Sequence, residues 1–99
     1  MICGTTPTHI FRLPFDTSRC DKVRITYAQC GETVLVKDVG DCSLSGNTVT
    51  VKLSQEETLL FKCHRKARVQ VRVLSVDGTA FASKIVEVSV EELLDREVL

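Results

Sequence analysis

The stretch KARVQVRVLS, residues 66 to 75, alternates between apolar and polar side chains more regularly than any other part of the chain. Its apolar members fall on every second position: Ala67, Val69, Val71 and Val73. Side chains along a β-strand point to opposite faces in turn, so this pattern indicates a strand with one buried face. The strongest ordered segment of the sequence is therefore a strand that needs an apolar layer against it.

Six other stretches carry the same alternation or a shorter form of it, and turn residues bound each one. They are THIFRLPF (8–15), KVRITYAQ (22–29), ETVLVKDV (32–39), DCSLSGN (41–47), NTVTVKL (47–53) and TAFASKIVEVSV (79–90). Pro14 places the first of them at a sheet edge. The connections at Cys30-Gly31 and Asp77-Gly78 predict two antiparallel hairpins. Six to seven strands, spaced about every ten residues, are typical of an all-β sandwich or barrel.

The composition is that of a single folded domain spanning residues 1–99. Hydrophobic residues make up 43% of the chain and charged residues 26%, far from the composition of disordered chains. Thirteen basic residues balance thirteen acidic ones, so no overall field attracts nucleic acid or an anionic membrane. No apolar run approaches the roughly 20 residues of a membrane span, and the start lacks signal-peptide features. We expect a soluble product of the cytoplasm, without nucleic-acid or membrane partners.

The five cysteines, at positions 3, 20, 30, 42 and 63, follow neither a metal-binding nor a disulfide pattern. No CxxC occurs, and an odd count leaves at least one thiol unpaired. Cys63 and His64 are neighbours, and they would point to opposite faces of a strand rather than at one metal ion. We expect free structural thiols, with a disulfide as the alternative, and neither a metal site nor a cofactor.

The segment SQEETLLF, residues 54 to 61, allows two interpretations. Glu56 and Glu57 could be a catalytic carboxylate pair, but adjacent residues do not face each other across a substrate bond. Ser54 and Glu57 instead match the S-x-x-E capping box that begins a helix. We predict a short helix at residues 54–61 that forms a structural corner between the sheets. Its predicted anchors on the core are Leu59, Leu60 and Phe61.

Basic residues concentrate in KCHRKARVQVR, residues 62 to 72. Arg68, Gln70 and Arg72 share the polar face of the strand and could meet phosphate. The aromatic side chains that nucleic-acid platforms use are absent there, which favours a solvated face or a contact with an acidic face of a neighbouring copy. No pair of nucleophile and base is indicated, because the two histidines, at 9 and 64, are far apart in the sequence.

Both ends of the chain differ from the β pattern. Residues 1–7 are predicted to be a flexible N-terminus, and EELLDREVL, residues 91–99, a short C-terminal helix or tail. The apolar residues of this tail, namely Leu93, Leu94, Val98 and Leu99, need somewhere to pack. They could cover their own sandwich or a neighbouring subunit, since exposed apolar surface costs about 25 cal/mol per Å². A further candidate contact is the sheet edge from Ile10 to Leu13.

Several of these segments together resemble a family of small proteins encoded in phages and prophages of gut Firmicutes. They are THIFRLPFD, KVRITYAQ, VTVKLSQEETLLF and VQVRVLSVDGTAFASKIVEVSV followed by EELLDREVL. The chain also resembles, more loosely, the N-terminal immunoglobulin-like domain of phage baseplate upper proteins. The resemblance implies an immunoglobulin-like antiparallel β-sandwich that acts as a non-catalytic part of a tail, a baseplate or another virion structure.

Three classes of function follow as hypotheses. The first is a virion structural protein, made in the cytoplasm of the bacterial host, whose partners are other phage structural proteins or further copies of itself. The second is a module that binds a carbohydrate or protein of the host surface. Such sites commonly use exposed aromatic residues, and this chain has no Trp and one Tyr, which the alternation places inward. The third, an enzyme, has no catalytic constellation in the sequence to support it.

Overall fold

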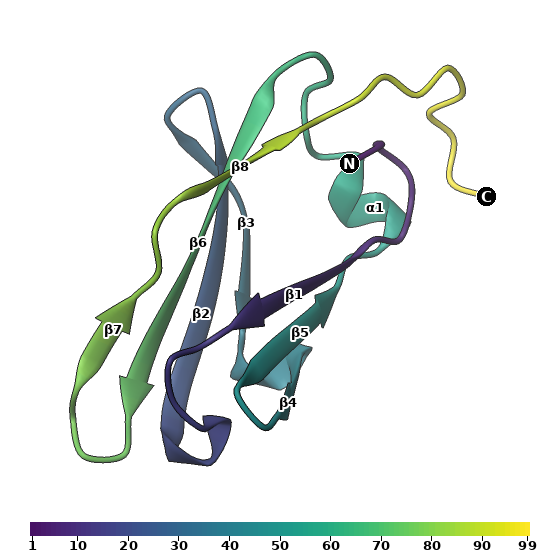
Figure 1. The fold of residues 1–99 in the computed structure, drawn as a ribbon. Coiled ribbons are helices and arrows are strands. Elements are labelled where there is room, and N and C mark those ends of the chain that lie inside the picture. Colours follow the sequence, from purple (N-terminus) through teal and green to yellow (C-terminus); the bar gives the residue numbers. More distant parts are fainter.

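A computed structural model describes residues 1–99, which fold into two β-sheets packed face to face (Figure 1). The molecule is elongated along the strands, with extents of 46 × 27 × 16 Å. The strands are β1 Thr8–Arg12, β2 Cys20–Gln29, β3 Glu32–Asp38, β4 Cys42–Ser45, β5 Thr48–Lys52, β6 Lys66–Ser75, β7 Ala80–Ala82 and β8 Val86–Ser89. The helical turns are η1 Thr17–Arg19, η2 Val39–Asp41 and α1 Gln55–Thr58.

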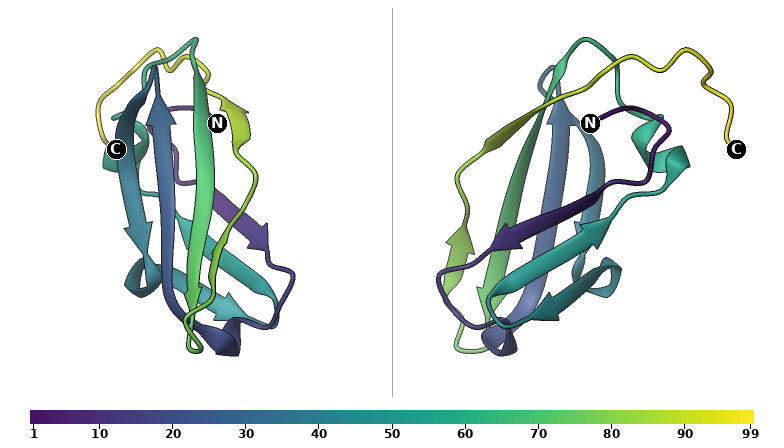
Figure 2. Two further views of the ribbon diagram at one scale, coloured as in Figure 1. Left: turned by 90° about the vertical axis from the view of Figure 1, so that its left-hand side faces the viewer. Right: turned by 45° about the vertical axis from the view of Figure 1, so that its right-hand side comes forward.

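The strand order is that of an immunoglobulin-like sandwich. One sheet has the order β1-β5-β4, which corresponds to strands B, E and D, and the other has the order β3-β2-β6-β7, which corresponds to C′, C, F and G. All strand pairs are antiparallel. The chain crosses between the sheets from β1 to β2, from β3 to β4 and from β5 to β6 (Figures 1 and 2). The predicted fold class is confirmed.

The last predicted strand, residues 79–90, is interrupted. Both of its parts, β7 and β8, pair with β6. Between them, Ser83 takes over the missing sheet bonds: its Oγ accepts from the Val71 N–H at 3.0 Å, and its carbonyl accepts from Gln70 Nε2 at 2.9 Å. The single strand predicted for residues 79–90 therefore corresponds to two strands, β7 and β8.

The core lies between the inner faces of the two sheets. Tyr27 and Phe61 are its largest buried side chains, and their rings meet edge to face with centroids 5.9 Å apart. Such a pair stabilises beyond the area it buries. The other buried apolar residues are Cys3, Leu13, Val23, Ile25, Val49, Val51, Leu53, Ala67, Val69, Val71, Val73 and Val90. The inward positions of β6 are those that the alternation predicted.

The first strand lies at a sheet edge as predicted, but it is shorter than the predicted one and ends at Arg12. Beyond it, the Leu13 N–H donates to the Asn47 carbonyl at 2.7 Å, and the Leu13 side chain is buried. The predicted contact edge is therefore wrong at Leu13, although Ile10 is 62% exposed.

The first residues of the chain are packed rather than free, in contrast to the predicted flexible N-terminus. The Met1 ammonium donates to the Ser89 carbonyl at 2.7 Å, and Ile2 forms a parallel bridge with Glu91. Cys3 is fully buried. Gly4 has a φ of +74°, and a Cβ there would come within 2.5 Å of Leu93 Cδ2. The strand alternation carries no signal for this contact between the two ends of the chain.

Candidate interaction surfaces

The predicted capping box is present at the start of α1. Ser54 Oγ accepts from the Glu57 N–H at 3.2 Å, and Glu57 Oε1 accepts from the Ser54 N–H at 2.9 Å. The helix is only four residues long, and it lies between β5 of one sheet and β6 of the other (Figure 1). Its two glutamates diverge, because Glu56 is exposed whereas Glu57 is tied to the corner.

An ion pair with Lys37 of β3 holds Glu57 in this place, and both side chains are largely shielded from solvent. Partial burial raises the pKa of Glu57, but the hydrogen bonds from Lys37 and from the Ser54 N–H, with the charge of Lys37, outweigh that effect. The net pKa of Glu57 lies below its ordinary value. An ionised carboxylate has no proton to donate as a general acid, and these contacts tie Glu57 to the corner.

The three predicted anchors behind the helix differ in their burial. Phe61 is 1% exposed and belongs to the core, and Leu59 packs against the core while partly buried. Leu60 is 58% exposed, so its prediction as an anchor is wrong. Three consecutive residues at a helix end point in different directions, and they cannot all face one core.

One of the two histidines, His9, contacts a buried titratable side chain, that of Tyr27. His9 Nδ1 and the Tyr27 hydroxyl are 2.7 Å apart. Burial lowers the pKa of His9, and burial also raises the pKa of Tyr27. No Ser or Cys side chain bonds to this imidazole. The pair therefore satisfies a buried phenol beside the core and does not activate a nucleophile.

The five cysteines are free, with side chains that range from buried at Cys3 to exposed at Cys30. No group of three or more His, Cys, Asp or Glu side chains is placed to hold a metal ion. No helix has the length and apolar character needed to cross a membrane.

The outer face of the larger sheet carries the three predicted interface residues of β6. Arg68 and Arg72 are exposed, and Gln70 between them is partly covered because its side chain bonds to the Ser83 carbonyl. They lie on one face of the strand, as the alternation predicted. Arg68 and Arg72 line two different depressions of the surface.

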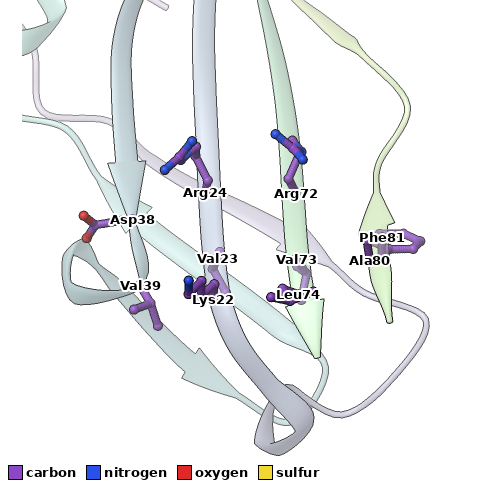
Figure 3. Close-up of a pocket in the computed structure, with 10 residues that line it drawn as sticks. All are labelled: Lys22, Val23, Arg24, Asp38, Val39, Arg72, Val73, Leu74, Ala80 and Phe81. Atoms are coloured by element: carbon purple, nitrogen blue, oxygen red, sulfur yellow. The ribbon is translucent and has the colours of Figure 1, made fainter. Parts of the chain in front are cut away.

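The depression at Arg72, which we call the outer-sheet depression, has a volume of about 450 Å³. It lies over the beginning of β2 and the end of β6, between the end of β3 on one side and β7 on the other (Figure 3). Its lining residues are Lys22, Val23, Arg24, Asp38, Val39, Arg72, Val73, Leu74, Ala80 and Phe81. An apolar surface bordered by a few charged side chains is the usual composition of a binding site.

Strand register brings the charges of the depression together. Arg24 of β2 lies directly opposite Arg72 of β6, and on its other side Arg24 lies opposite Asp38 of β3. Neither arginine forms an ion pair within 4.0 Å. Like charges directly opposite each other destabilise a sheet. Two unpaired arginines on neighbouring strands therefore form a local anion-attracting point in a chain of zero net charge.

Sequence reasoning found Arg72 but did not find the depression. The alternation shows that Lys22 and Arg24 point outward, yet it does not show which strand lies beside β2. Their proximity to Arg72 and Leu74 depends on a pairing between residues about fifty positions apart. Only the register of β2 against β6 reveals it.

The C-terminal segment, residues 91–99, is an extended tail without a helix. Leu93 is partly buried against the core, whereas Leu94 is 95% exposed, Leu99 99% and Val98 47%. Two side chains hold its backbone at the corner: Arg96 Nη2 donates to the Leu59 carbonyl at 3.1 Å, and Gln55 Oε1 accepts from the Leu99 N–H at 2.9 Å. The tail is tethered, but the side chains of Leu94 and Leu99 are not covered.

No protein-family model and no curated protein matches this chain. Among solved structures, the chain is similar to the V domain of amphioxus IgVJ-C2, with 14% sequence identity and a TM-score of 0.36. The match covers 91% of this chain and 96% of that chain. The fold assignment rests on the order and pairing of the strands described above.

Proposed function

We propose that this chain is a non-catalytic, immunoglobulin-like structural component of a phage or prophage virion, associated with the tail or baseplate, and that it acts through protein–protein contacts. It would be made in the host cytoplasm and assembled with other phage structural proteins or with copies of itself. The resemblance of its strand and corner motifs to phage proteins supports the virion assignment. The surface of the domain supports the contact role.

The observation that carries the contact role is the exposure of Leu94 and Leu99, at 95% and 99%. Burying a leucine side chain contributes about 1.5–3 kcal/mol relative to leaving it in water. Isolated apolar residues are common on protein surfaces. Here, however, two almost fully exposed leucines lie in one irregular stretch of six residues, 94–99. A partner that covers both would gain affinity from a segment that contributes little to its own domain.

The alternative of a host-surface binding module has less support. Carbohydrate sites commonly present exposed aromatic rings. Tyr27 and Phe61 are buried in this chain, and the other aromatic side chains, Phe11, Phe15 and Phe81, are partly covered. A saturable signal on a glycan array or with host envelope fractions would favour this alternative over the virion role.

The direct test is the location of the chain in the bacterium that carries its gene. Prophage induction, purification of particles on a density gradient and mass spectrometry should find the chain in the particles at a constant ratio to tail proteins. Deletion of the gene should yield particles with an altered tail or none at all. The proposal is contradicted if complete, infectious particles lack the chain and form equally well without its gene.

A further inference from the structure

The charged surroundings of the outer-sheet depression are strongly biased toward basic groups. Lys22, Arg24 and Arg72 border it, and Asp38 is its one acidic neighbour. Leu74, partly buried, lies beside these cations in register with Lys22 on the neighbouring strand. Figure 3 shows Arg24 and Arg72 at one level of the sheet and Lys22 with Leu74 at the next. A complementary ligand would therefore combine acidic groups with an apolar side chain.

The tail of the same chain has this chemistry. Residues 91–99 contain four acidic residues and one basic residue, a net charge of −3. Leu94 lies between these charges and Leu99 follows them, and both leucines are almost fully exposed. The tail is extended, so it could lie along a shallow surface without first unfolding a helix.

The tail cannot reach the depression of its own domain. β8 runs antiparallel to β6 and therefore carries the chain away from Arg72 and toward the opposite end of the sandwich. Arg72 lies five residues along β6 from Ala67, the register partner of Val88, which is about 17 Å, and Leu93 follows five residues after Val88 on the side away from Arg72, next to Gly4 (Figure 1). Beyond the packed Leu93, the last six residues span at most about 20 Å, and they pass over α1 (Figures 1 and 2).

We propose that residues 91–99 of one copy dock in the outer-sheet depression of a second copy. The acidic side chains of the tail, Asp95 and Glu97 among them, meet Arg24 and Arg72 and relieve their mutual repulsion. An exposed leucine of the tail covers the apolar surface at Leu74. The tail and the depression are different surfaces, so the contact either closes as a two-fold dimer, in which each copy's tail occupies the other's depression, or repeats head to tail into a ring or a filament. This inference rests on the proposed function and gives it a defined self-contact.

The first test is the oligomeric state of the full chain in solution. Sedimentation velocity over a range of micromolar concentrations should show association that weakens as salt rises, since the Debye length falls from about 10 Å at 0.1 M to about 3 Å at 1 M. Deletion of residues 94–99 should abolish the association while leaving the packed Leu93 in place. A full chain that stays monomeric throughout this range overturns the inference.

The second test changes the depression. The double substitution Arg24→Gln and Arg72→Gln should abolish association as fully as the deletion does. Its matched control is Arg65→Gln with Arg68→Gln, which removes the same charge from exposed positions outside the depression and should leave association within twofold of the unchanged chain. Circular dichroism and thermal unfolding would establish that all variants fold. Equal loss in both double variants would point to a general charge effect and would overturn the proposed site.

The decisive test mixes two defective copies. The chain shortened by residues 94–99 keeps its depression, and the Arg24→Gln, Arg72→Gln chain keeps its tail. Each should be monomeric alone, and a mixture should form a complex of one copy of each that grows no further. A mixture that stays monomeric, at concentrations where the unchanged chain associates, overturns the contact between tail and depression. Detection of the chain in virions tests the proposed function separately, so the two can fail independently.

Discussion

The corner at α1 and the outer-sheet depression both gather charged side chains, but they differ in how those charges are satisfied. At the corner, Glu57 has an ion pair with Lys37 and hydrogen bonds within the capping box. In the depression, Arg24 and Arg72 face each other without an ion-pair partner. Glu57, which the sequence suggested as one of two catalytic carboxylates, stabilises the corner. The charges without an ion-pair partner, Arg24 and Arg72, lie on the neighbouring strands β2 and β6.

This difference has an energetic meaning. When the partner of a satisfied, partly buried charge is removed, that charge loses its interactions. A substitution beside it therefore lowers the free energy of unfolding. An unsatisfied surface charge loses little, and removing one of two opposed like charges can even stabilise the domain. Substitutions at the corner should therefore reduce stability, and substitutions in the depression should change association instead.

The largest expected effect is at the base of the corner. Phe61→Ala should lower the free energy of unfolding by about 3–5 kcal/mol, because it removes a buried ring and leaves a cavity beside Tyr27. Urea unfolding monitored by circular dichroism would measure the change. Leu60→Ala is the matched control, since Leu60 is 58% exposed and should cost less than about 0.5 kcal/mol. Comparable losses in both variants would show that the burial of this segment is misassigned.

The capping box should give the next largest effect. Ser54→Ala removes the acceptor of the Glu57 N–H and should cost about 1 kcal/mol of stability. Ser43→Ala, at an exposed strand position, serves as the control and should cost a few tenths of that. If the two variants unfold at the same urea concentration, the cap does not stabilise the corner.

The pH dependence of stability tests the ion pair of the same corner. The pKa of Glu57 is below its ordinary value of 4.5, so its contribution is present above that pH and is lost as pH falls through the lower pKa of the folded state. The unchanged chain should lose stability in this acidic range, and Glu57→Gln should lose less across it. Glu56→Gln, at the exposed neighbour, should follow the unchanged chain. If the free energy of unfolding falls equally with acid pH in Glu57→Gln and in the unchanged chain, Glu57 does not contribute to the pH dependence of stability.

The sequence predicted the features whose residues lie close together along the chain. Alternation over ten residues located β6, and the three-residue spacing of Ser54 and Glu57 located the capping box. Features that depend on tertiary pairing were missed. Cys3 is buried because the first residues bridge to Glu91, at the far end of the sequence. The depression exists because Arg24 pairs with Arg72, a register that local periodicity does not encode.

The smallest expected effect on stability is in the depression, and it has the opposite sign from those at the corner. Arg72→Gln should leave the monomer unchanged or raise its free energy of unfolding by about 0.2–1 kcal/mol, because it removes one of two cations that face each other across β2 and β6, and its partner on the other side is the uncharged Ala82. Urea unfolding of the chain without residues 94–99 would measure this free of association. Arg68→Gln has no arginine opposite it in the register, since its partners are Ala28 and Glu87, and it should not stabilise the domain. A loss of more than about 1 kcal/mol on Arg72→Gln would mean that this guanidinium is already satisfied within its own chain, as the charges of the corner are, and the distinction between the two regions would disappear.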